Sequence, residues 1–283
     1  MLGDNAYQAG EDSEYQAAVF DMYPNILKNT VLWPTRGNHD EYSEKSQSIP
    51  YYDIFTLPTK AEAGGIASGT EAYYSFDYGN IHIVSLDSYI SDKSKTGPMM
   101  TWLKNDLDNT EADWIIAFWH HPPYTKGHHD SDIEEPSILI RENALPILES
   151  HGVDVVLSGH SHTYERSYLI NKHYGDSTTF ESSMIISSGS GNAEGDGVYQ
   201  KPAYGKSPHE GTVYIVAGSS GKTSKRLPRD HPAIFKSLKE LGSVVLKICG
   251  NKLEAEFLNS IGKISDSFTI IKGDLPICEI QSN

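Results

Sequence analysis

Helical and extended segments alternate along the middle of the chain, as judged by the spacing of its apolar residues. Apolar side chains recur at helical spacing in residues 97–110, and a continuous apolar run in residues 113–124 ends in a histidine and proline cluster. The same order returns as a predicted helix at 137–150 and a predicted strand at 153–158. Such alternation is typical of an α/β fold, in which ligands bind at the carboxyl ends of strands.

Weaker patterns extend this outline on both sides. Residues 11–29 have helical spacing interrupted by Pro24 and lead into an extended run at 31–35, while residues 72–88 alternate around a YGN turn and predict a hairpin. From residue 212 onward the chain is rich in strands of antiparallel character. Two polar stretches are expected to be insertions: 44–70, which is irregular, and 172–210, which predicts a long surface loop.

Length and charge narrow the possible function classes. The 283 residues contain no linker-like segment, which favours one domain over residues 1–283. A formal net charge of −15 argues against binding nucleic acid or a membrane surface through bulk charge. No run of about 18 apolar residues predicts a membrane-spanning helix, and no signal peptide opens the chain. A phosphate-bearing substrate would therefore need locally placed cations.

Histidines gather in three polar loops, each of which follows an apolar run. These loops hold seven of the twelve histidines: His39, His120, His121, His128, His129, His160 and His162. If the apolar runs are neighbouring strands, the loops converge on one edge of a sheet. Neutral imidazoles with carboxylates and amide oxygens suit transition-metal ions. A lone histidine more often has an ordinary structural role, as expected for His82, His151, His173, His209 and His231.

Four motifs in order give the chain a family resemblance. The segments GDNAY (3–7), GNHD (37–40), HHPPY (120–124) and GHSHTYERS (159–167) resemble the calcineurin-like metallophosphoesterase superfamily, and within it the purple acid phosphatases. Tyr7, three residues after Asp4, and the TYERS segment separate this subfamily from its relatives. The resemblance implies an αββα fold, in which two mixed β-sheets form a sandwich flanked by helices.

The resemblance also implies a binuclear metal centre. One ion would bind Tyr7 and His162, the other would bind Asn38, His120 and His160, and Asp4 would bridge the two. His120 is preferred to His121 because the family's ligand lies two residues before a proline, here Pro122. A tyrosinate ligand favours iron(III), and the second ion would be zinc, manganese or iron(II).

The implied reaction is hydrolysis of phosphate monoesters by attack of a hydroxide held by the two metal ions. His39 resembles the family's phosphate-contacting histidine, and either His128 or His129 resembles the one that acts on the leaving group. The substrate would be a small phosphorylated molecule, and the family resemblance suggests a secreted or periplasmic protein. The alternatives are a phosphodiesterase or nucleotide hydrolase, and a metal-binding protein with impaired catalysis.

One element of the family pattern does not precede GDNAY. The family has an earlier strand that ends in an Asp-x-Gly motif, whose aspartate completes the tyrosine-side ligand set, but only Met1 and Leu2 precede Gly3. Loss of a ligand weakens metal binding. We therefore expect that the chain is an N-terminally truncated form in which the first strand is missing.

Overall fold

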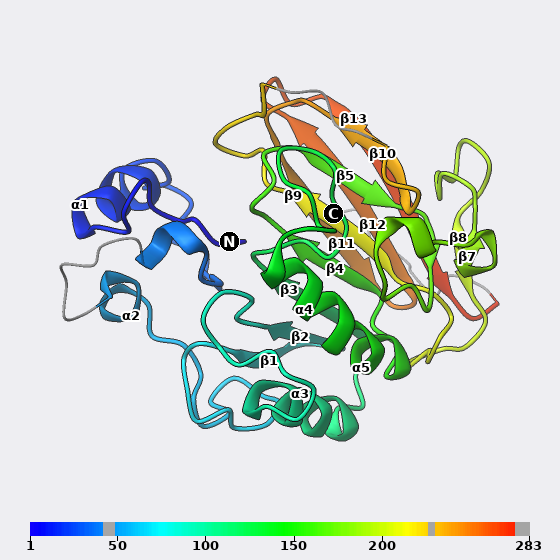
Figure 1. The fold of residues 1–283 in the computed structure, drawn as a ribbon, viewed down its shortest axis with the longest axis horizontal. Coiled ribbons are helices and arrows are strands. Elements are labelled where there is room, and N and C mark those ends of the chain that lie inside the picture. Colours follow the sequence, from blue (N-terminus) through cyan, green and yellow to red (C-terminus); the bar gives the residue numbers. More distant parts are fainter. Residues whose placement is uncertain (42–48, 226–229, 275–283) are drawn as a thin grey trace.

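The computed structural model describes residues 1–41, 49–225 and 230–274. Its largest unit is a seven-stranded mixed sheet with the strand order β1-β2-β3-β4-β9-β5-β10 (Figure 1). The strands are β1 (Tyr74–Tyr78), β2 (Ile81–Ser85), β3 (Trp114–Trp119), β4 (Val155–Ser158), β5 (Tyr164–Ser167), β9 (Val213–Ala217) and β10 (Ile234–Leu238). Strands β2, β3, β4 and β9 are parallel neighbours, so their carboxyl ends share one edge of the sheet.

A second sheet of four strands packs on one face of the first. It has the order β11-β12-β13-β8, and β8 runs parallel to β13 while the other pairs are antiparallel. Its strands are β8 (Tyr199–Lys201), β11 (Gly242–Cys249), β12 (Lys252–Asn259) and β13 (Ile264–Lys272). Two short strands, β6 (Leu169–Ile170) and β7 (Ile185–Ser187), form a further pair.

Helices cover the opposite face of the large sheet. Figure 1 shows α3 (Pro98–Asn109), α4 (Glu135–Asn143) and α5 (Leu145–Ser150) grouped beside β2, β3 and β4. Because successive side chains of a strand point to opposite faces, Ile115 and Ala117 pack in the helix-side core, while Trp114 belongs to the core between the two sheets and donates its indole N–H to the carbonyl of Gly250 at 2.8 Å. The remaining helical segments are short: α1 (Asp12–Tyr15), a π-helical turn (Gln16–Phe20), α2 (Pro50–Ile54), and 3₁₀ turns at Asn38–Glu41, Ser177–Thr179 and Ser182–Met184.

The structure confirms the expected α/β fold of two mixed sheets with flanking helices. The predicted hairpin corresponds to β1 and β2, the predicted strands at 113–124 and 153–158 to β3 and β4, and the helix at 97–110 to α3. The antiparallel strands expected after residue 212 are also present. No helix among the described residues has the length and apolar content needed to cross a bilayer.

Four expectations about local structure were wrong. The helix at 11–29 ends early, because Pro24 lacks a backbone donor and the apolar side chains of Met22 and Ile26 are exposed rather than packed. The extended run at 31–35 forms only a bridge between Thr35 and Leu2. The helix at 137–150 divides at Ala144, since Pro146 favours the first turn of a new helix.

The fourth concerns the segment 172–210, which was expected to be a long surface loop. It contains β7 and β8, and the side chains of Tyr199 and Lys201 are fully buried. The segment 44–70 includes α2 and buries Tyr51, while residues 42–48 lie outside the described part of the chain. The polar composition of segment 172–210 therefore gave no indication of β8, which belongs to the second sheet.

A buried ion-pair cluster joins the two sheets. Asp154, at the start of β4, places one carboxylate oxygen 2.6 Å from Lys201 Nζ of β8 and the other 2.8 Å from Lys272 Nζ of β13. All three side chains are almost completely buried. Lys272 Nζ also donates to the carbonyl oxygens of Asp113 and Gly205, at 2.5 and 2.8 Å. Removing one partner of such a cluster leaves an uncompensated buried charge, which costs about 3–5 kcal/mol.

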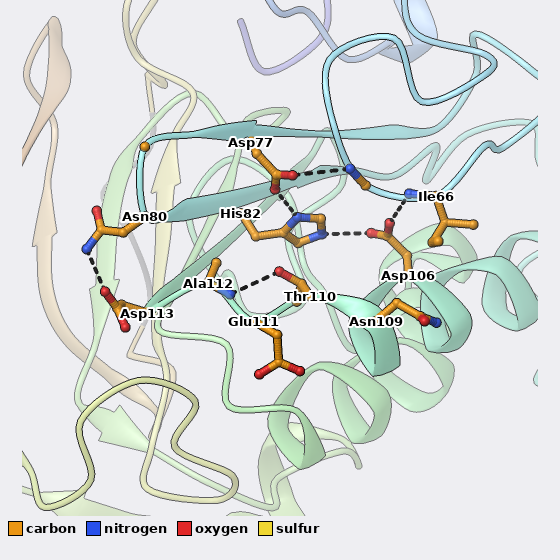
Figure 2. A pocket seen from close by; sticks show the side chains of 12 residues that line it. Ile66, Asp77, Asn80, His82, Asp106, Asn109, Thr110, Glu111, Ala112 and Asp113 are labelled. Atoms are coloured by element: carbon orange, nitrogen blue, oxygen red, sulfur yellow. Dashed lines mark hydrogen bonds and ion pairs between the residues drawn. The ribbon is translucent and has the colours of Figure 1, made fainter.

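At the opposite end of β2 from the histidine loops, His82 lies between two carboxylates (Figure 2). Its Nδ1 is 2.7 Å from Asp77 Oδ1 and its Nε2 is 2.8 Å from Asp106 Oδ2, while Asp106 Oδ1 accepts a hydrogen bond from the backbone N–H of Ile66. The imidazole is fully buried beside a cavity of about 450 Å³. Burial lowers the pKa of His82, but the hydrogen bonds and charges of both carboxylates outweigh it and raise the pKa overall.

We expect the contribution of His82 to stability to depend on pH. Because its pKa is higher in the folded protein, this contribution is fully present below the unfolded-state pKa of about 6.5 and is lost as pH rises through the folded-state value. The substitution His82→Gln should lower the free energy of unfolding by about 3 kcal/mol near pH 5.5, and by less above pH 7. Urea unfolding from pH 5 to 9 measures this, with His151→Gln as the control, since His151 is only partly buried and pairs with the single, exposed carboxylate of Asp108. A difference that stays constant over this range would contradict the expectation.

Candidate metal centre

The histidine loops meet at the edge formed by the carboxyl ends of the parallel strands. His120 directly follows β3, and His160 and His162 lie between β4 and β5. The N-terminus lies near the same edge (Figure 1). The backbone carbonyl of Leu2 there lies 2.8 Å from His120 Nδ1. The segment at Gly37–Asp40 follows Thr35, which is bridged to Leu2. Parallel strands thus bring together residues that are up to 158 positions apart, from Asp4 to His162.

Four potential ligand atoms converge beside His120. Its Nε2 lies 3.1 Å from Asn38 Oδ1, 3.1 Å from His160 Nδ1 and 3.2 Å from Asp4 Oδ1. Since the carbonyl of Leu2 can only accept, Nδ1 of His120 donates to it, and Nε2 faces this group. Burial acts to lower the pKa of His120, but Asp4 outweighs it and raises the pKa, so in the metal-free protein Asp4 favours a proton on Nε2. Nitrogen and oxygen lone pairs directed at one point require a cation between them, either a proton or a metal ion.

A second group of donors lies on the other side of Asp4. The Tyr7 hydroxyl donates to Asp4 Oδ2 at 2.7 Å and is 3.2 Å from His162 Nε2. The two oxygens of Asp4 therefore face different groups, Oδ1 toward His120 and Oδ2 toward Tyr7. This is the arrangement that a carboxylate needs to bridge two ions.

The protonation states suit metal binding. Burial is the main cause that lowers the pKa of His160 and of His162 to about 4, so both rings are neutral at neutral pH. Burial acts to raise the pKa of Asp4, but His120 and several hydrogen bonds hold it well below its usual range. The buried Nδ1 of His162 has no hydrogen-bond partner among the described residues. Neutral imidazoles, a carboxylate, an amide oxygen and a phenol fit transition-metal ions as ligands.

The backbone around these ligands is tightly constrained. A Cβ atom on Gly3 would lie 2.4 Å from His120 Nδ1, and one on Gly37 would lie 2.3 Å from the Asp4 nitrogen. Asp4 and His160 have positive φ angles of 52° and 61°, a conformation that costs roughly 1 kcal/mol or more for each residue. The glycines of GDNAY and GNHD are thus needed for close approach of the two loops.

A buried carboxylate fixes these two loops to each other. Asp40 Oδ1 accepts hydrogen bonds from the Asn5 backbone N–H at 2.9 Å and from the Tyr15 hydroxyl at 2.7 Å. Its Oδ2 accepts from Asn5 Nδ2 at 3.0 Å and from the Gly37 N–H at 2.8 Å. Asp40 is fully buried, and it connects the neighbour of Asp4 with the residue that precedes Asn38.

The three histidines expected to act outside the ligand set all surround this centre. The His39 ring packs on Tyr7 with centroids 4.4 Å apart, and its backbone N–H donates to Asp4 Oδ1 at 2.9 Å. His128 stacks on His162 at 5.0 Å, and His129 lies 3.7 Å from the His160 ring.

Two further side chains lie at the centre, and the first of them, Glu134, was missed by the sequence reasoning. Glu134 links two histidines, since its carboxylate is 2.5 Å from His129 Nδ1 and 3.2 Å from His160 Nε2. Both histidines contribute to lowering the pKa of Glu134 to about 2, against the effect of burial. His121, expected either behind the ligands or on the surface, is buried behind them, with Nδ1 2.9 Å from Ser88 Oγ and its ring 4.4 Å from that of His160.

His121 and Glu134 each belong to a group of three that could hold a metal ion: His120, His121 and His160, or His129, Glu134 and His160. A doubled histidine marks position 121 in the sequence, but no pattern marks position 134. The choice of His120 over His121 as a ligand remains a prediction.

Comparisons with known proteins identify relatives of the chain. The family described as calcineurin-like phosphoesterase matches residues 1–164. Purple acid phosphatase 15 of Arabidopsis thaliana is 33% identical over 151 residues, which are 50% of this chain and 26% of that protein. Purple acid phosphatase 18 of the same plant is 31% identical over 188 residues, 62% of this chain and 40% of that protein. The chain thus spans between a quarter and two fifths of these relatives.

Solved structures share the fold at low sequence identity. The purple acid phosphatase PPD1 from yellow lupin (Lupinus luteus) seeds superposes with a TM-score of 0.59 and 19% identity over 88% of this chain and 43% of that chain. GAP50, the anchor in the inner membrane complex of Plasmodium, superposes with a TM-score of 0.58 and 14% sequence identity, over 95% of this chain and 76% of that chain. A dinuclear metal centre is a property that the purple acid phosphatase relatives imply. With the family match over more than half of its length, the chain belongs to the calcineurin-like phosphoesterase family and has purple acid phosphatases among its homologues.

Proposed function

We propose that the chain is a binuclear metal-dependent hydrolase of phosphate monoesters. The observation that carries the proposal is the orientation of Asp4, whose two carboxylate oxygens face two separate donor groups. Tyr7, His162 and Asp4 would hold one ion, for which the phenolate favours iron(III). Asp4, Asn38, His120 and His160 would hold the other, which is zinc, manganese or iron(II).

The bound ions would supply Lewis acidity and a nucleophile that works at neutral or acidic pH. They would also supply the positive field that a chain with a net charge of −15 lacks. The protein's own contribution is to place polar groups around the phosphate. His39 has Nδ1 2.9 Å from the carbonyl of Gln8, which orients its ring beside Tyr7, where it would contact the phosphate.

Protonation of the leaving alkoxide is assigned to the loop that carries His128 and His129. Glu134 bonds Nδ1 of His129, so Nδ1 keeps its hydrogen throughout, and the imidazolium form would give the second proton, on Nε2, to the leaving alkoxide and become the neutral ring. His128 instead stacks face to face on His162. The contacts favour His129 as the general acid and leave His128 as part of the wall of the site.

Loss of a proposed ligand should remove metal and activity together. We expect the wild-type chain, purified and reloaded with iron and zinc, to bind about two ions and to hydrolyse p-nitrophenyl phosphate. The substitution His160→Ala should reduce both the metal content and kcat/KM, the latter about 100-fold or more, because it deletes a ligand. Elemental analysis and a colorimetric assay measure the two effects.

His151→Ala is the matched control, since His151 directly follows α5 and pairs with Asp108 rather than with any proposed ligand, so that it should change neither quantity. A wild-type chain that binds two ions but cleaves no ester would instead be a metal-binding protein without catalysis. Faster cleavage of bis(p-nitrophenyl) phosphate than of the monoester would make it a diesterase. Either result would contradict the proposal.

Tyr7 gives the proposal a spectroscopic test that is independent of turnover. Burial and Asp4 raise the pKa of Tyr7 in the metal-free protein, so its phenol stays protonated until a metal ion displaces the proton. The iron-loaded wild type should therefore absorb visible light through phenolate-to-iron charge transfer. Tyr7→Phe should lose this band, and exposed Tyr23→Phe should keep it. A band of equal intensity in Tyr7→Phe would exclude Tyr7 as a ligand.

A further inference from the structure

Beneath the metal centre lies a closed cluster of three hydroxyl side chains and one carboxylate. Ser161 and Thr163 flank the ligand His162, Thr125 lies in the loop after β3, and Glu165 is in β5. The four side chains of this cluster are fully buried, with no measurable exposure to solvent. Ser161, Thr163 and Glu165 belong to the GHSHTYERS motif, but none of the four residues is among the proposed ligands.

Glu165 accepts hydrogen bonds from both sides of the cluster. Thr163 Oγ1 donates to it at 3.0 Å and the Lys126 backbone N–H at 3.2 Å, and the Thr125 hydroxyl donates to the same oxygen as Thr163. Among the described residues, no lysine, arginine or histidine nitrogen lies within 4 Å of this carboxylate as an ion-pair partner. Burial raises the pKa of Glu165. A carboxyl group buried without a cation is costly, so its retention needs a reason.

Ser161 continues the cluster to the two outer histidines. Its Oγ accepts from the His128 N–H at 3.0 Å and from the His129 N–H at 3.5 Å, and it lies 3.0 Å from Thr125 Oγ1, to which its own O–H can donate because the Thr125 proton goes to Glu165. The loop fits closely here, since a Cβ on Gly127 would lie 2.5 Å from Thr163 Oγ1. The backbone of both outer histidines is thus bonded to a serine placed between two proposed metal ligands.

We propose that Glu165 is a positioning residue that fixes the loop carrying His128 and His129 at the correct distance from the metal ligands, so that His129 reaches the leaving group. The inference rests on the proposed function. Glu165 acts through Thr125, Lys126 and Ser161 and touches neither metal nor substrate. Its effect should therefore fall on proton transfer to the leaving group rather than on metal binding.

The dependence of rate on the leaving group separates positioning from a purely structural role. An alkoxide needs a proton as it departs, whereas p-nitrophenolate is stable enough to leave without one. The substitution Glu165→Gln should therefore lower kcat for glycerol 2-phosphate about 100-fold and kcat for p-nitrophenyl phosphate less than about 3-fold, with KM and metal content unchanged. A loss of packing alone would reduce both rates equally.

Glu149→Gln is the matched control. Glu149 is also a buried glutamate that accepts three hydrogen bonds, from Tyr214 and Tyr174 hydroxyls at 2.6 and 2.7 Å and from the Lys172 N–H at 2.7 Å, but it lies in α5 away from the metal centre. The Glu149→Gln variant should lower thermal stability as Glu165→Gln does. Its ratio of kcat for glycerol 2-phosphate to kcat for p-nitrophenyl phosphate should stay at the wild-type value.

A second pair of variants decides the matter if Glu165→Gln does not fold. Thr125→Val removes the hydroxyl that bonds Glu165 and Ser161 at nearly constant volume, and Thr125→Ser keeps it. The valine variant should show the selective loss on glycerol 2-phosphate, and the serine variant should restore the wild-type ratio. Equal losses on both substrates, or no loss, would overturn the positioning role. A wild-type chain that cleaves neither ester would overturn the proposed function as well.

Discussion

The hydrogen bonds to the Asp40 carboxylate are the constraint on which the metal centre depends. Four donors from Asn5, Tyr15 and Gly37 reach this one buried group and hold the first two motif loops together. With these loops fixed, Asp4 has its two oxygens directed to different sides. The parallel strands β3 and β4 then supply the remaining histidines from the edge where their carboxyl ends meet. Sheet topology places the ligands, and Asp40 sets the spacing of the loops that the sheet does not hold.

Sequence reasoning succeeded where a prediction depends on neighbouring residues, such as the spacing of apolar side chains. It also succeeded where several short motifs follow one another in the order known for a family. The continuous apolar runs of β3 and β4 and the helical spacing of α3 were sufficient for their prediction. The ordered histidine motifs also predicted which loops converge, and the structure brings all nine predicted site residues into one region: Asp4, Tyr7, Asn38, His39, His120, His128, His129, His160 and His162. Their roles as ligands or catalytic groups remain predictions.

The features that sequence reasoning missed depend on partners far away in the chain. Glu134 is one of several acidic residues in a polar loop, and its contact with His160 arises only after α4 packs on the sheet. Glu165 lies in a polar motif, yet β5 is inserted between β9 and β10 and buries it. Lys201 occupies a stretch of loop-like composition, but its ammonium group is neutralised by Asp154 from another sheet. In each case a tertiary contact overrides local composition.

The ion-pair cluster of Asp154, Lys201 and Lys272 has a consequence for how much of the chain the candidate metal centre needs. The family match ends at residue 164, but the carboxylate that directly precedes β4 finds its two cations only in β8 and β13, which follow later in the sequence. Without those strands, Asp154 would be a buried charge with no partner, at a cost of about 3–5 kcal/mol. The histidines that follow β4 therefore depend on lysines beyond residue 200 for a stable sheet beneath them, although every proposed ligand lies in the first 162 residues.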